Sequence, residues 1–123
     1  MTPETRVKNE VINYLKALQI VYNEPIEVCR RDAGGFNYRK GMPDCYFVYN
    51  GIHVELEFKA PNGTPSSMQL MWQRKFKEVY NIDDYIVSSL DEVKDIVEYY
   101  RQLGKTLNQF KTEHPYTKKD MLN

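Results

Sequence analysis

Two carboxylates and a lysine in the middle of the chain have the types and spacing for metal chemistry. Asp44 follows Pro43, and Glu57 stands two residues before Lys59. Hard divalent cations such as Mg²⁺ prefer oxygen ligands, and a nearby lysine can stabilise charge that develops on a reacting group. These side chains indicate a cation-assisted reaction if the fold brings them together.

A β-hairpin centred on Asn50-Gly51 is predicted to do so. Asn-Gly suits a two-residue type I′ turn because both residues tolerate positive φ. The register of such a hairpin places Asp44 opposite Glu57, with Cβ atoms about 5 Å apart. Like charges repel at that distance, so a bound cation would account for the arrangement.

Alternation along the two hairpin strands separates an apolar face from a polar one. We expect the apolar face in the core and the acids on the other face. A solvated face with scattered charges would show the same split, so the pattern alone leaves that alternative open. The expected core face holds Cys45, Phe47, Tyr49, Ile52, Val54, Leu56 and Phe58, and the polar face holds Asp44, Tyr46, Val48, His53, Glu55, Glu57 and Lys59.

Length and charge indicate a single domain without bulk attraction to nucleic acid. The 123 residues carry a formal net charge of zero at pH 7, which still permits a local basic groove. The cysteines Cys29 and Cys45 lack metal-ligand spacing and are expected to be buried thiols. No signal peptide, lipidation motif or long apolar run is present, so we expect a cytoplasmic protein with no membrane partner.

The elements around the hairpin are predicted in the order helix, strand, hairpin, helix, strand, helix, which is a mixed α/β fold. A first helix from Pro3 to Gln19, capped by Thr2, has Glu4 at the top of its buried stripe. Glu4 could therefore face inward, although a surface residue complementing the helix dipole is the alternative. The other predicted elements are a short strand at 20–22 and 26–29, a helix from a Ser66 cap to Tyr80 that buries Leu70, Trp72 or Phe76, and Val79, a strand at 85–88, and a helix from a Ser89 cap to Gly104.

Residues 1–104 are thus expected to form one domain, and residues 105–123 a tail or arm. Within the domain, the segment from 30 to 40 is a basic, glycine-containing loop that leads to Asp44. Its cationic side chains would neutralise phosphates, and its aromatic ones could stack on bases; a solvated loop is the alternative. The candidate DNA-binding residues are Arg30, Arg31, Tyr38, Arg39 and Lys40.

Gln69 has two possible roles. It stands three residues after Ser66, which is the spacing of a capping box. The same side chain could reach the hairpin acids, and the sequence leaves both readings open.

Pro43-Asp44 followed by Glu57-Phe58-Lys59 resembles the PD-(D/E)xK signature of the restriction-endonuclease-like nucleases. More narrowly, Gly-Met-Pro-Asp, the Glu-Phe-Lys-Ala-Pro-Asn-Gly run and the downstream Gln69 resemble the VRR-NUC family, the virus-type replication-repair nucleases. The resemblance spans Glu4 to about Val97 and implies a site made of Glu4, Asp44, Glu57, Lys59 and Gln69. Glu55 is an additional acid beside this site for which the resemblance supplies no role.

The resemblance implies a DNA endonuclease that uses Mg²⁺ or Mn²⁺ and hydrolyses phosphodiester bonds. Asp44, Glu57 and the Phe58 carbonyl would hold the ion, with Glu4 acting through water. Small members of the family resemble homodimeric phage and bacterial enzymes that cut four-way (Holliday) junctions in DNA repair, so branched DNA and a homodimer are expected, in the host cytoplasm if the protein is phage-encoded. The alternatives are a nucleic-acid-binding module without turnover and a sequence-specific restriction-like nuclease.

Overall fold

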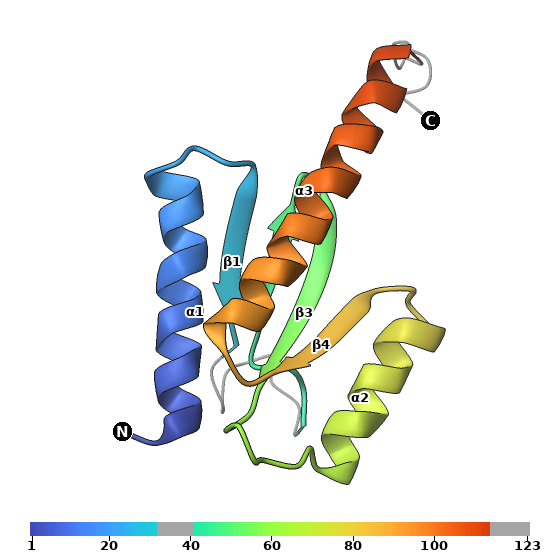
Figure 1. Cartoon of the computed structure of the whole chain (residues 1–123). Helices are drawn as coiled ribbons and strands as arrows, with labels where there is room; N and C mark the ends of the chain where they lie inside the picture. Colours follow the sequence, from blue (N-terminus) through green and yellow to red (C-terminus); the bar gives the residue numbers. More distant parts are fainter. Residues whose placement is uncertain (32–40, 114–123) are drawn as a thin grey trace.

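A mixed sheet forms the centre of the structure, with helices packed around it (Figure 1). The computed structural model describes residues 1–31 and 41–113. Its elements are α1 (Pro3–Ile20), β1 (Ile26–Arg30), β2 (Cys45–Tyr49), β3 (Ile52–Phe58), α2 (Ser67–Glu78), β4 (Asp83–Val87) and α3 (Leu90–Glu113). The predicted α/β class and the order αβββαβα are confirmed.

The hairpin has the predicted register. The strand order is β1-β2-β3-β4, with β1, β2 and β3 antiparallel and β4 parallel to β3. At the turn, Tyr49 pairs with Ile52, and Asn50 and Gly51 have φ values of 50° and 87°. At the other end Cys45 pairs with Leu56, so the same register, continued by one residue, brings Asp44 beside Glu57.

The apolar hairpin face packs against α1 and α3. Figure 1 shows α3 (orange) crossing the sheet next to α1 (blue). The predicted helix stripes and strand face meet there in one core, because each element presents its apolar residues to that layer. The buried core residues are Val11, Leu15, Leu18, Ile26, Cys45, Phe47, Tyr49, Val54, Leu56, Phe58, Val87, Val93, Val97 and Tyr100.

Helix α2 packs against β4, away from that core, and it buries fewer residues than predicted. Trp72 and Phe76 are buried, and the Gln73 Nε2 donates a hydrogen bond to the Asp84 carbonyl oxygen at 3.2 Å. The predicted burial of Leu70 and Val79 is wrong, since their exposed fractions are 45% and 66%. Leu70 lies about 160° around the helix from Trp72, and Val79 is the C-cap residue beyond the last turn.

The predicted strand segment at 20–22 is also wrong. Ile20 is the last residue of α1, and the N–H groups of Val21 and Tyr22 both donate to the Ala17 carbonyl oxygen, closing the helix end. The three residues are 69% to 76% exposed. β-branched and aromatic residues suggested a strand, but backbone capping of the helix prevailed.

Helix α3 continues past Gly104, where it was predicted to end. The Asn50 side chain donates a hydrogen bond to the Gly104 carbonyl oxygen at 3.3 Å, and a Cβ on Gly104 would lie 3.1 Å from that Asn50 nitrogen. The glycine thus lets the helix pass close to the hairpin turn. The division into a domain at 1–104 and a tail at 105–123 stays a prediction. Among the described helices, α3 included, none is both long and apolar enough to span a bilayer.

Candidate active site

Three carboxylates from three different segments of the chain converge at one end of the sheet. Glu4 comes from the first turn of α1, Asp44 precedes β2, and Glu57 lies near the end of β3. One oxygen from each lies within 4.8 Å of the other two. All three line a cavity of about 480 Å³, which is completed by Gly41, Met42, Ser66, Ser67, Met68 and Gln69.

Asp44 is oriented by contacts to both of its oxygens. Its Oδ2 accepts a hydrogen bond from the Phe58 backbone N–H at 2.9 Å, and its Oδ1 lies 3.9 Å from the Lys8 Nζ. Lys8 is a neighbour of the site that sequence reasoning missed. Its position one helical turn after Glu4 was a usable signal, because residues four apart share a helix face.

Glu57 is the most constrained of the three acids. Its exposed fraction is 4%, and its Oε1 accepts a hydrogen bond from the Gln69 Nε2 at 2.5 Å. Its Oε2 is buried and has no hydrogen-bond partner among the described residues. Burial, together with the charge of Asp44, raises the pKa of Glu57 from 4.5 to about 9. In the absence of a compensating cation, this carboxyl group holds its proton at neutral pH.

The donor set fits a hard divalent cation. A buried carboxylate oxygen without a partner is costly, and a cation there would supply the missing partner while offsetting the repulsion between Asp44 and Glu57. Carboxylate oxygens are the ligands that Mg²⁺, Mn²⁺ and Ca²⁺ prefer. Glu4, Asp44 and Glu57 are therefore the residues that could hold a metal.

Gln69 performs both of the roles that the sequence left open. Its backbone N–H donates to the Ser66 Oγ at 3.2 Å, and its side-chain oxygen accepts from the Ser66 N–H at 2.8 Å, which completes the capping box. The side-chain nitrogen remains available for Glu57. The cap thus fixes the amide that holds the buried carboxylate.

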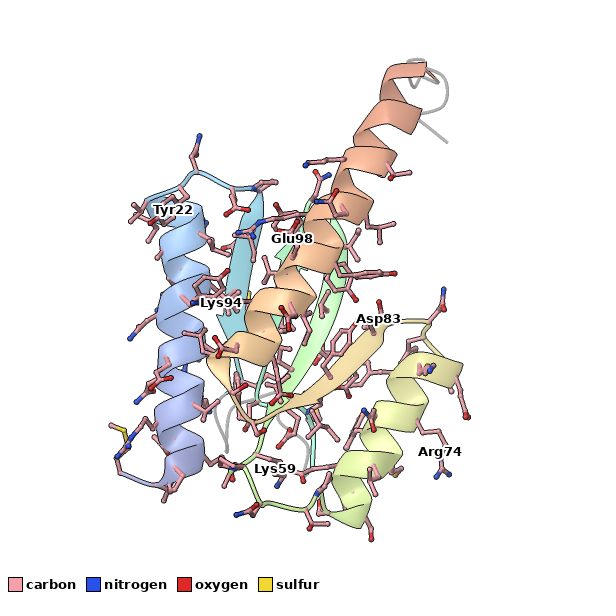
Figure 2. All side chains as sticks on the ribbon, in the orientation of Figure 1. Tyr22, Lys59, Arg74, Asp83, Lys94 and Glu98 are labelled. Carbon is pink, nitrogen blue, oxygen red and sulfur yellow. The ribbon has the colours of Figure 1, made fainter. Side chains whose placement is uncertain are left out.

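Lys59 follows β3 directly, and its backbone N–H donates to the Val87 carbonyl oxygen at 2.9 Å. Figure 2 labels it near the lower ends of α1 and α2, where the chain leaves the sheet. Its positive charge opposes the upward shift in the pKa of Glu57. Its catalytic role, and metal binding by the Phe58 carbonyl, stay predictions.

The candidate DNA-binding residues are only partly described. Arg30 ends β1 with an exposed side chain. Tyr38, Arg39 and Lys40 lie outside the described residues. Arg31 directs its guanidinium to Glu55 inside the protein, with Nη2 donating to Oε2 at 2.9 Å and Nη1 bonded to Oε1.

Glu55 is the residue that sequence reasoning could not place. Its exposed fraction is 0%, and besides Arg31 it bonds the Nε2 of His53. His53 stacks on Tyr46 with ring centroids 4.4 Å apart, and the Arg31 guanidinium lies 4.9 Å from the Tyr46 ring centroid. The alternation of the hairpin correctly put these side chains on the polar face. Nothing in that pattern indicated that the face would be covered there by Arg31.

Comparison with known proteins agrees with this architecture. No protein-family model matches the sequence, and no curated protein matches it. The chain is similar to a solved structure described as a VRR_NUC domain, at 24% sequence identity and a TM-score of 0.63, over 81% of this chain and 99% of that one. The fold is therefore restriction-endonuclease-like. Within that class it is a VRR-NUC-like fold, which confirms the resemblance noted in the sequence at the level of the fold.

Gly41 fixes the position of the Asp44 segment against the helix that carries Gln69. Its φ is +82°, and a Cβ there would lie 2.6 Å from the Met68 Cβ and 3.0 Å from the Met68 carbonyl carbon. We expect Gly41→Ala to lower the free energy of unfolding by about 3 kcal/mol, from positive φ and steric overlap together.

Gly51→Ala is the matched control, because Gly51 has a φ of +87° and a Cβ added there would meet nothing within 4 Å. It should cost only about 1 kcal/mol. Chemical denaturation of both variants measures the difference. Equal losses would show that contact with Met68 is unimportant.

Proposed function

We propose that this protein is a metal-dependent DNA endonuclease that hydrolyses phosphodiester bonds. The observation that carries the proposal is the buried Glu57 beside Asp44 and Glu4, with a carboxylate oxygen lacking a partner among the described residues. The VRR-NUC-like fold supports a nuclease over other metal-binding proteins. A carboxylate cluster at a strand end of this fold is suited to positioning a cation against a phosphate.

Each residue of the site has a proposed role that follows from its position. Asp44, Glu57 and the Phe58 carbonyl would hold Mg²⁺ or Mn²⁺, and Glu4 would act through a water molecule. The bound ion supplies Lewis acidity to the scissile phosphate and a lowered pKa to an attacking water. Lys59 orients that water or stabilises charge on the phosphate. Gln69 keeps Glu57 directed into the site.

The DNA backbone would be bound beside this site by the basic segment that leads to it. Arg30, Arg39 and Lys40 would neutralise phosphates, and Tyr38 would stack on a base. A cytoplasmic location fits DNA as the substrate. It also fits the two free cysteines, Cys29 and Cys45, because disulfides are rare in the cytosol.

We further propose that branched DNA, such as a four-way junction, is cut by a homodimer. One chain offers one cluster of this kind in its described part, whereas paired cuts across a junction require two sites related by symmetry. The Trp72 side chain of α2 is buried, at 8% exposure, and offers little surface to a second chain. The candidates for the interface are the exposed apolar side chains of α2, Met68, Leu70 and Met71, which are 39% to 45% exposed, and the segment after Gly104.

The test is a panel of labelled four-way, flap, duplex and single-stranded DNA with Mg²⁺ or Mn²⁺, combined with light scattering of the protein. We expect metal-dependent cleavage with a preference for branched DNA, and a mass of two chains. Binding without cleavage would favour the inactive binding module, and cleavage at one duplex sequence would favour a restriction-like enzyme. A monomer that makes paired cuts would contradict the dimer.

A further inference from the structure

Arg31 and Glu55 form a buried ion pair next to the carboxylate cluster. Glu55 has no exposed surface, and the Arg31 side chain is 18% exposed. In the sheet, Glu55 pairs with Tyr46 of β2 on one side and with Asp84 of β4 on the other. A carboxylate in such a central position is stable only if it is paired with a cation and hydrogen-bonded.

Arg31 also hydrogen-bonds the backbone carbonyl groups of both Pro43 and Asp44. Its backbone N–H donates to the Asp44 carbonyl oxygen at 2.8 Å, which extends the β1–β2 pairing by one residue. Its Nη1 donates to the Pro43 carbonyl oxygen at 3.3 Å while also bonding Glu55. One residue therefore holds the segment that presents the Asp44 carboxylate.

Glu55 connects Arg31 to β3, the strand that carries Glu57. It lies two residues before Glu57 on β3, on the same side of the strand. The chain from Asp44 through Pro43 and Arg31 to Glu55 thus joins the start of β2 to the end of β3. These are the two places that supply Asp44 and Glu57 to the candidate metal site.

We propose that Arg31 and Glu55 are positioning residues that set the separation and orientation of Asp44 and Glu57 for metal binding. The inference rests on the proposed metal site, and it assigns Arg31 to that role instead of contact with DNA. The Nη1 and Nη2 atoms of Arg31 are bonded to Glu55 and to the Pro43 carbonyl oxygen, and the side chain is only 18% exposed. Withdrawal of the guanidinium toward a phosphate would leave a fully buried carboxylate with His53 as its remaining hydrogen-bond partner among the described residues, which is costly.

The chain contains a matched control for this pair. Arg101 binds Glu24 with Nε donating to Oε1 at 2.7 Å and Nη2 donating to Oε2 at 2.9 Å. Both pairs are two-point bonds between an arginine and a carboxylate, but Glu24 and Arg101 lie beside Tyr49 and Asn50, at the turn end of the hairpin. Lysine cannot make such a fork of bonds, so Arg31→Lys and Arg101→Lys remove comparable interactions at different distances from the site.

The experiment measures the dissociation constant of Mn²⁺ from the full chain without DNA, using the electron paramagnetic resonance signal of free Mn²⁺. We expect Arg31→Lys and Glu55→Gln to weaken Mn²⁺ binding by about tenfold or more, and Arg101→Lys to change it less than twofold. In cleavage assays, the Mg²⁺ concentration for half-maximal rate should rise in parallel, whereas the KM for DNA at saturating Mg²⁺ should stay within twofold. Glu55→Gln keeps the size of the side chain and serves if Arg31→Lys does not fold.

Unchanged Mn²⁺ affinity in Arg31→Lys, with a raised KM for DNA, would overturn the proposal in favour of a DNA contact. Equal weakening of Mn²⁺ binding in Arg31→Lys and Arg101→Lys would show that the effect is general destabilisation of the protein. That result would also overturn the proposal. If the unmutated protein binds Mn²⁺ through Asp44 and Glu57 but cleaves no DNA, the proposed function fails while the comparison of Mn²⁺ affinities still decides the role of Arg31. Absence of Mn²⁺ binding by the unmutated protein would contradict both the proposed function and the positioning role of Arg31 and Glu55.

Discussion

Replacement of Asp44, Glu57 or Lys59 by alanine is expected to reduce DNA cleavage by at least about a thousandfold. Each carboxylate removed takes away a ligand of the proposed metal site, and loss of Lys59 takes away the cation that would orient water or stabilise the phosphate. Single-turnover cleavage at saturating Mg²⁺ measures the loss. The proteins should still fold, because these side chains lie outside the core formed with α1 and α3.

The helix that carries Glu4 provides a control for this experiment. Glu4 belongs to the cluster, whereas Glu10 lies on the same helix with an exposed side chain. Glu4→Ala should reduce cleavage, by less than the Asp44 and Glu57 variants if it acts through water, and Glu10→Ala should leave the rate unchanged. Near-normal cleavage by either hairpin carboxylate variant would contradict the proposed metal site.

In the metal-free protein, Glu57→Gln is expected to raise the free energy of unfolding at pH 8 by about 1 to 3 kcal/mol. The pKa of folded Glu57 is raised to about 9, from an ordinary value of 4.5. Between these two values the folded chain binds a proton that the unfolded chain has released. The free energy of unfolding of the unmutated protein should therefore fall as the pH rises from about 5 to 9.

Glutamine removes the titration and keeps an oxygen that can accept the bond from Gln69. Asp84 also contributes to the pH dependence, because burial and the charge of Glu55 raise its pKa from 3.8 to about 7. Its contribution has the same sign and ends near pH 7. Asp84→Asn should therefore make the fall in stability less steep below pH 7, where Glu57 still contributes, and should preserve the fall between pH 7 and 9. Glu57→Gln should remove the fall between pH 7 and 9.

Urea denaturation between pH 5 and 9 in the presence of a chelator measures these profiles. Adding Mg²⁺ should then stabilise the unmutated protein, by an amount that grows with the logarithm of the metal concentration, and should have little effect on Glu57→Gln. A stability profile for Glu57→Gln that matches the unmutated protein would show that Glu57 does not carry a raised pKa.

Local rules in the sequence predicted much of what positions the site. Asn50-Gly51 determined the hairpin register because the turn needs positive φ at both positions. The spacing of Ser66 and Gln69 predicted the capping box that starts α2. These features depend on residues close together in the chain, so the sequence displays them directly.

The wrong predictions have both local and long-range causes. The strand predicted at 20–22 is absent because the N–H groups of Val21 and Tyr22 donate to the Ala17 carbonyl oxygen at the end of α1, and Leu70 is exposed because it lies on the opposite side of α2 from the buried Trp72. Gly104 suggested a helix end, but it allows close packing against Asn50, 54 positions away in the chain. The partners of Glu55 depended in the same way on how Arg31 folds back over Tyr46, a long-range arrangement that periodicity does not specify.

The most direct test of the central claim is cleavage of one labelled four-way junction by the purified protein and by Asp44→Asn, each with Mg²⁺ and with a chelator. Asparagine keeps the size of Asp44 and an oxygen that can accept the Phe58 N–H, so the change removes mainly a charge. We predict cleavage by the unmutated protein that requires Mg²⁺, with product from Asp44→Asn reduced at least about a thousandfold. Cleavage that persists in chelator, or that Asp44→Asn retains at a normal rate, would contradict the proposed metal-dependent site.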